Sequence, residues 1–181
     1  RGPSRAIVAD LTKPDITGPG DNIYAAYIAP NNYGFLGGTS MSSPHIAGAG
    51  ALVRAMRPTW SPMAVKSALQ MTAKSAGVKE DTVSPWHADD VGSGRVQVDK
   101  AIAAGLVMEE TGANFLAANP TGGSINIKQL NVPSVRNMNC TPNCTFTRTV
   151  TSKLAAASTW NVSFASEYGV NVVVSPATFT I

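Results

Sequence analysis

The residues best placed for chemistry lie in one run between Gly38 and Gly48. It reads Gly-Thr-Ser-Met-Ser-Ser-Pro-His-Ile-Ala-Gly. Gly37 and Gly38 allow a sharp turn, and Pro44 suits the first turn of a helix. Ser40 is therefore expected near the positive end of a helix, where unpaired backbone N–H groups can face an anion. That setting suits a serine oxygen that attacks a carbonyl group, although a serine there can also be a plain N-cap.

A helix and a strand must hold Ser40 in position. Residues 41–56 are small and apolar on almost every side, which predicts a helix that is buried all round and ends at residues 57–58. Upstream, a short apolar run, a buried strand and a loop are predicted in that order at residues 6–9, 22–28 and 30–34.

A second helix is predicted shortly after the first. Ser61 is a good N-cap and Pro62 a good first helical residue, so residues 63–76 form an amphipathic helix that Gly77 ends. A last short helix is predicted over residues 100–104. Alternating strands, turns and helices of this kind indicate an α/β region.

The composition changes near residues 109–112. Beyond this point β-branched and polar residues alternate, which predicts a small antiparallel β domain. Its expected strands are residues 124–127, 145–151, 160–164 and 170–174. The chain is thus divided into a first region, residues 1–109, and a second region, residues 110–181.

The run around Ser40 resembles the nucleophile segment of the subtilisin-like serine proteases, the subtilases. Their signature reads Gly-Thr-Ser-Met-small-small-Pro-His-aliphatic-Ala/Ser-Gly, and every position agrees in type. The resemblance implies that Ser40 is the nucleophile of a serine endopeptidase. Looser matches in the expected order extend it along the chain, at residues 1–3, 13–20, 61–62 and 92–96.

The second region also has a counterpart in this family. Residues 130–134 and 147–151 resemble the fibronectin-III-like C-terminal domain of the same enzymes. The resemblance therefore implies the C-terminal part of a subtilisin-like catalytic domain, with a parallel sheet and helices on both faces, in residues 1–109. A β-sandwich-like domain, expected to be incomplete, follows in residues 110–181.

A serine nucleophile needs a histidine base and a carboxylate that orients it. The only histidines are His45 and His87. If His45 shares the helix of Ser40, it lies about 140° around and about 7 Å along it, too far for a hydrogen bond. The family signature implies a structural role for His45. His87 lies among carboxylates but matches no family motif, so a solvated loop histidine is expected.

The other catalytic groups are expected in an upstream segment. In subtilases the triad runs aspartate, histidine, serine along the chain, and nothing before Ser40 resembles the family's aspartate, histidine or oxyanion-asparagine motifs. Asp15 and Asp21 are expected to be turn residues. Ser40 can still offer its own N–H to an oxyanion, and Thr39 and Gly38 are expected to border the substrate.

Cys140 and Cys144 are the only cysteines, in Cys-Thr-Pro-Asn-Cys. Pro142 and Asn143 favour a turn that brings the sulfurs together, so a disulfide is expected. Free thiols or half of a metal site are the alternatives. A disulfide indicates an oxidising compartment, which agrees with a secreted protein.

Composition narrows the function further. Charged residues make up only 14% of 181 residues, and the 14 basic residues form no cluster, so neither a nucleic-acid groove nor a basic membrane patch is supported. No apolar stretch is long enough to span a membrane. No cofactor is identifiable; the family resemblance allows calcium, but no loop has its alternating oxygen ligands.

Two other functions compete with a secreted endopeptidase that cleaves proteins or peptides. One is a non-catalytic adhesion or binding protein that keeps a subtilase scaffold. The other is a serine hydrolase acting on esters or lipids, which favours Gly-x-Ser-x-Gly. Ser42 stands where that motif requires the second glycine, which disfavours this alternative.

Overall fold

The computed structural model describes residues 2, 10–28, 32–166 and 169–181. The apolar run at residues 6–9 lies outside them, as do residues 30–31 of the expected loop. The elements are β1 (Ile23–Ala26), β2 (Tyr33–Leu36), α1 (Thr39–Met56), α2 (Pro62–Met71), α3 (Ala88–Val91), α4 (Val98–Ile102), β3 (Leu106–Val107), α5 (Gly112–Ala117), the 3-10 helix η1 (Ile127–Gln129), β4 (Thr151–Ser152), β5 (Thr159–Asn161) and β6 (Thr178–Thr180).

The sheets of the described ranges are small and antiparallel. They pair β1 with β2, β3 with β4 and β5 with β6. A single parallel bridge, between Thr17 and Arg95, lies outside these sheets. Among the described residues, neither the expected parallel sheet of the first region nor the expected sandwich of the second is formed. The expected loop at residues 30–34 is wrong at its end, because Tyr33 and Gly34 pair with Ala26 and Ala25.

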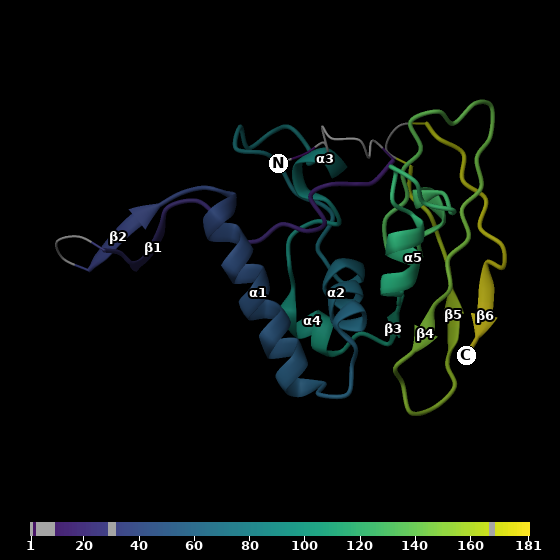
Figure 1. Ribbon diagram of the computed structural model, residues 1–181, viewed down its shortest axis with the longest axis horizontal. Helices are drawn as coiled ribbons and strands as arrows, with labels where there is room; N and C mark the ends of the chain where they lie inside the picture. Colours follow the sequence, from purple (N-terminus) through teal and green to yellow (C-terminus); the bar gives the residue numbers. More distant parts are fainter. Residues whose placement is uncertain (1, 3–9, 29–31, 167–168) are drawn as a thin grey trace.

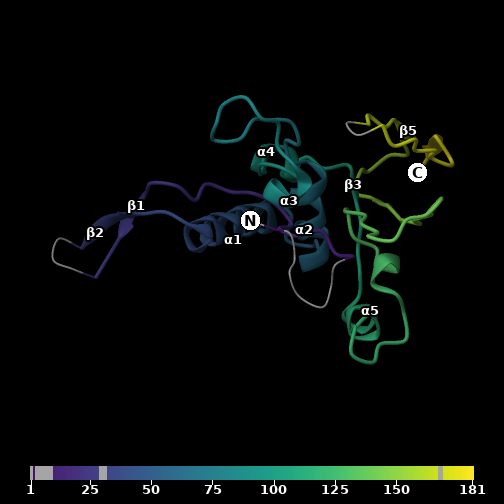
Figure 2. The ribbon, with the colours of Figure 1, turned by 90° about the horizontal axis from the view of Figure 1, so that it is seen from above.

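The main core lies where α1, α2, α4 and β3 meet. Small side chains let these elements approach closely: Ala64, Ala68 and Ala101 are fully buried, as are Val53 and Val107. Figure 1 shows α2 and α4 beside α1, and the β1–β2 hairpin projecting beyond the start of α1. The hairpin and strands β5 and β6 lie at opposite ends of the long axis in both views (Figures 1 and 2).

Helix α1 forms as predicted, but the expectation that it is buried all round is wrong. Only Ala49 and Val53 are buried, whereas Leu52 is 58% and Met56 63% exposed. In the described ranges α2 and α4 cover one face of α1, and its other faces are open. Small apolar residues allow neighbouring segments to pack on every side of a helix. They do not show which segments do so.

Helix α2 confirms its predicted start and ends earlier than predicted. The Ser61 side chain accepts a hydrogen bond from the N–H of Ala64 at 3.0 Å, and Pro62 opens the helix. The helix ends at Met71 rather than near residue 76. Lys74 instead exchanges two backbone hydrogen bonds with Arg95, of 2.8 and 2.9 Å, and this pairing takes the chain out of the helix.

The second region has fewer strands than predicted. A helix, α5, forms where none was expected, capped by Thr111, and residues 127–129 form η1 where a strand was expected to end. Strands β4 to β6 are two or three residues long, and none lies within 170–174. A small core of Ala118, Leu130 and Val132 holds α5 and η1 together.

A buried carboxylate lies at the start of the second region. Glu110 accepts hydrogen bonds from the N–H groups of Asn131 and Thr111, at 2.6 and 2.7 Å, and from the side chain of Asn114. Burial raises the pKa of Glu110, but these hydrogen bonds and the charge of Arg148 outweigh it and leave the pKa below its usual 4.5. Glu110 is therefore a charged, satisfied group that holds residues 111, 114 and 131 of the second region together.

Two further features agree with the expectations for the second region. Cys140 and Cys144 form the expected disulfide, with their Cα atoms 5.4 Å apart. None of the helices in the described ranges is both long and apolar enough to cross a membrane.

Candidate active site

The candidate site is built on the turn that starts α1. Gly38 is the N-cap residue, with φ 143° and ψ 174°, a conformation that only glycine adopts readily. Its N–H donates to the carbonyl oxygen of Gly20 at 2.6 Å. Glycine at this position lets the chain turn sharply from β2 into the helix, and the contact with Gly20 fixes where the helix begins.

Ser40 is the second residue of α1, and its side chain is exposed. The N–H groups of Met41 and Ser42 bond to the Gly38 carbonyl, at 3.0 and 3.2 Å. The N–H groups of Thr39 and Ser40 have no hydrogen-bond partner within the part of the chain that the structure describes. We call these two groups the open amides. They lie at the positive end of an 18-residue helix, where a negative charge is stabilised.

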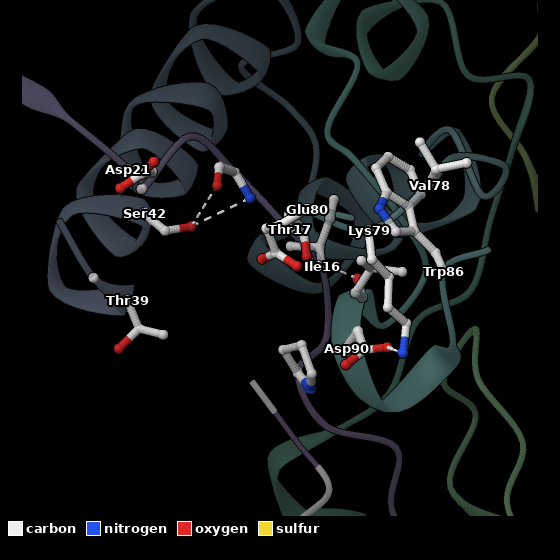
Figure 3. A pocket seen from close by; sticks show the side chains of 15 residues that line it. Ile16, Thr17, Asp21, Thr39, Ser42, Val78, Lys79, Glu80, Trp86 and Asp90 are labelled. Carbon is white, nitrogen blue, oxygen red and sulfur yellow. Dashed lines mark hydrogen bonds and ion pairs between the residues drawn. The ribbon is translucent and has the colours of Figure 1, made fainter. Parts of the chain in front are cut away.

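A pocket of about 610 Å³ borders this turn. Gly38, Thr39 and Ser42 form its wall on the side of α1. Figure 3 shows Trp86 and Lys79 on the opposite wall, where Lys79 pairs with Asp90 at 2.8 Å. This wall could not be predicted from the sequence. Residues 78–91 carry no motif, and they come near α1 only in the folded chain.

His45 lies on α1 with Ser40, as expected. Its ring nitrogen Nδ1 is 2.7 Å from the carbonyl oxygen of Met41, one turn earlier. That contact holds the imidazole against its own helix. It agrees with the structural role that the signature implies for His45.

His87 is exposed and lies outside the helices, as expected for a solvated loop histidine. It directly precedes α3 as the N-cap, and its Nδ1 accepts a hydrogen bond from the N–H of Asp89 at 3.2 Å. The Asp89 carboxylate also lies 3.7 Å from this nitrogen. Histidine rarely caps helices, so helix α3 was not expected from the residue at this position.

Asp15 is held by lysines, as a structural residue would be. Its carboxylate lies 2.6 Å from Lys13 Nζ and 3.2 Å from Lys66 Nζ. Burial raises the pKa of Asp15, but the two lysines outweigh it and leave the pKa below 3.8. Asp21 is exposed and lines the pocket beside Gly20.

The described residues therefore provide an exposed serine, the open amides and, next to Thr39, a pocket lined from both sides. His45 is hydrogen-bonded to its own helix, and His87 to the first turn of α3. No group of three or more His, Cys, Asp or Glu side chains converges in the described ranges.

Comparison with known proteins matches both regions of the chain. Residues 3–96 match the profile described as Subtilase family, and residues 129–181 match that described as Fibronectin type-III domain. A subtilisin-like protease of Glycine max is 36% identical over 220 residues, covering 99% of this chain and 28% of that protein. Among Arabidopsis thaliana relatives, subtilisin-like protease SBT4.4 is 36% identical, covering 97% of this chain and 29% of itself.

Subtilisin-like protease SBT2.6 of the same plant is 34% identical, covering 96% of this chain. The chain spans 26 to 29% of the length of these three relatives.

Proposed function

Because the chain belongs to the subtilase family, we propose that it carries the nucleophile of a secreted serine endopeptidase, and that this nucleophile is Ser40. One observation carries the proposal. An exposed serine lies beside two open amides at the start of α1, inside the segment that matches the family. Proteins and peptides are the proposed substrates.

The proposed reaction is acyl transfer through Ser40. Its Oγ attacks the carbonyl carbon of the scissile peptide, while a histidine base takes the hydroxyl proton. The oxygen of the tetrahedral intermediate becomes negative, and the N–H of Ser40 stabilises it together with the positive end of α1. Collapse of the intermediate releases the amine, which takes the proton from histidine, and leaves an ester on Ser40. Water then hydrolyses this ester.

An upstream segment is proposed to supply the aspartate, the histidine and the oxyanion asparagine. Two observations support it. His45 is hydrogen-bonded to its own helix and His87 to the first turn of α3, and the relatives are more than three times as long as the part this chain matches. The same segment is proposed to cover the open faces of α1 and complete the parallel sheet. The second region is proposed to belong to a fibronectin-III-like sandwich.

Secretion and the absence of a cofactor complete the proposal. The Cys140–Cys144 disulfide supports an oxidising, extracellular location. Serine acyl transfer requires no cofactor, so no step of the proposed reaction is assigned to one. No nucleic acid or membrane partner is proposed.

The test compares three forms of the protease that contains this chain and its upstream segment. Ser40→Ala is expected to lower peptide hydrolysis by at least about 10⁴-fold, because the nucleophile is lost. Ser43→Ala is the matched control, because Ser43 is an exposed serine on the same helix turn. The chain without its upstream segment is expected to be inactive.

Two outcomes would contradict the proposal. Full activity in Ser40→Ala would assign the reaction to another residue. An intact but inactive wild-type protein would instead favour the non-catalytic scaffold.

A further inference from the structure

The side chain of Ser42 reaches from α1 to a segment 24 residues earlier in the chain. Its Oγ accepts a hydrogen bond from the N–H of Gly18 at 3.2 Å and donates one to the carbonyl oxygen of Gly18 at 2.9 Å. Figure 3 shows both bonds beside Thr39. One hydroxyl therefore satisfies both backbone polar groups of Gly18.

The segment that Ser42 holds lies directly against the start of α1. A Cβ at Gly18 would come within 2.8 Å of the Ile46 side chain, and one at Gly20 within 2.9 Å of the Gly38 carbonyl oxygen. Gly20 in turn accepts the hydrogen bond from the N–H of Gly38. A shift of residues 18–20 is therefore transmitted to the turn that carries Ser40.

The other end of this segment is anchored in the fold. The N–H of Thr17 donates to Gly94 and the N–H of Val96 donates to Thr17, both at 2.9 Å. The residue next to Gly18 is thus tied to residues 94–96, which lie far away in the sequence. Gly18 is a fixed point against which Ser42 can hold the first turn of α1.

We propose that Ser42 is a positioning residue for Ser40, an inference that rests on the proposed function. The pair of hydrogen bonds to Gly18 fixes the first turn of α1 and so places the Ser40 hydroxyl and its N–H together. An oxyanion donor works only when it is held close to its required place.

The experiment uses the full-length protease with its upstream segment. The variants are Ser42→Ala, Ser42→Thr, Ser42→Cys and the matched control Ser43→Ala, whose serine makes no hydrogen bond through its side chain in the described ranges. The rate constant for labelling of Ser40 by a fluorophosphonate is measured, with kcat and KM for one peptide substrate. Concentrations are corrected for folded protein by circular dichroism.

Ser42→Ala is expected to lower both the labelling rate constant and kcat about fivefold, as the loss of a hydrogen bond that orients a catalytic group would do, while KM changes less than about twofold. Ser42→Thr keeps the hydroxyl and is expected to restore most of both values. Ser43→Ala is expected to match the wild type. Ser42→Cys, with a weaker donor and acceptor, is expected to fall between the wild type and Ser42→Ala, and it replaces the alanine variant if that protein does not fold.

Three results would overturn the inference. If the wild type is labelled and Ser42→Ala and Ser43→Ala are labelled at equal rates, the role of Ser42 is overturned but the proposed function is not. No rescue by Ser42→Thr would show that the hydroxyl is not what matters. A wild-type protein that is not labelled at Ser40 would overturn the proposed function and this inference with it.

Discussion

Helices α1 and α2 begin in opposite ways. At α2, the Ser61 side chain accepts the hydrogen bond of the Ala64 N–H, and Pro62 removes a further donor. At α1, the N-cap is Gly38, which has no side chain to offer, and the N–H groups of Thr39 and Ser40 remain open in the described part of the chain. The serine of α2 therefore stabilises its helix, whereas Ser40 leaves the helix end available.

The difference separates a serine whose side chain caps its helix from one whose side chain the helix leaves exposed. Both serines lie at the start of a helix, and either can be an N-cap by its residue type. Ser61 precedes its helix and turns its oxygen back onto the backbone. Ser40 lies inside its helix and is exposed, and its N–H has no hydrogen-bond partner in the described part of the chain.

Among the proposed variants, Gly38→Ala is expected to have the largest effect, because it changes the turn that starts α1. The φ of 143° at Gly38 is essentially restricted to glycine, so alanine costs about 1–3 kcal/mol or forces the turn to move. We expect fluorophosphonate labelling of Ser40 to fall at least about tenfold.

Gly112→Ala is the matched control for Gly38→Ala. Gly112 is the first residue of α5 in the second region, away from α1, and a Cβ there meets nothing within 4 Å among the described residues. This variant is expected to keep the wild-type labelling rate and to stabilise the helix slightly. Equal labelling of the two variants would show that the geometry of the Gly38 turn does not matter.

Ser61→Ala should disturb α2 and leave the chemistry alone. Loss of the N-cap is expected to cost about 1 kcal/mol. Hydrogen exchange over residues 61–71 should become about fivefold faster, the factor that corresponds to that free energy. Labelling of Ser40, corrected for folded protein, should not change. A parallel loss of labelling would mean that the two helix starts are not independent.

The smallest expected effect concerns pH and Glu109, whose carboxylate accepts a hydrogen bond from the Ser61 hydroxyl. This bond lowers the pKa of Glu109 below its usual 4.5; burial opposes the shift and Lys153 adds to it. A lowered pKa stabilises the folded protein above pH 4.5, and this contribution disappears as the pH falls through the folded value. Because the carboxylate is partly exposed, we expect at most about 1 kcal/mol.

The measurement is the urea midpoint of wild type and Glu109→Gln between about pH 6 and pH 3. The wild type should lose more stability over this range than Glu109→Gln. If the urea midpoint depends on pH in the same way for the two proteins, Glu109 does not contribute to stability through its bond to Ser61.

Local chemistry made the helix starts predictable. The Ser61-Pro62 pair predicted the start of α2, and the Gly-rich turn predicted the start of α1, because caps and turns depend on neighbouring residues. The disulfide followed for the same reason, since only four positions separate Cys140 from Cys144.

Features that depend on distant partners were missed. The end of α2 is set by the pairing of Lys74 with Arg95, and the exposure of α1 depends on which elements cover it. Alternation over residues 124–127 predicted a strand, but Asn126 and Gln129 form a capping box that starts η1. A period of two indicates an extended segment only if another strand pairs with it.

Only the part of the candidate site that is contiguous in sequence could be predicted. The run around Ser40 identified the nucleophile candidate, because it is contiguous in sequence. The contact between Ser42 and Gly18 spans 24 residues, and the far wall of the pocket comes from residues 78–91. Neither could be read from spacing, since both require the folded chain.

The most direct test of the central claim is the intact mass of the protease, with its upstream segment, before and after reaction with a fluorophosphonate, followed by peptide mapping. We predict a single adduct on Ser40 in the wild type and in Ser61→Ala, and none in Ser40→Ala. An adduct on another serine, or an unlabelled protein whose upstream segment is present and folded, would contradict the assignment of Ser40 as the activated nucleophile.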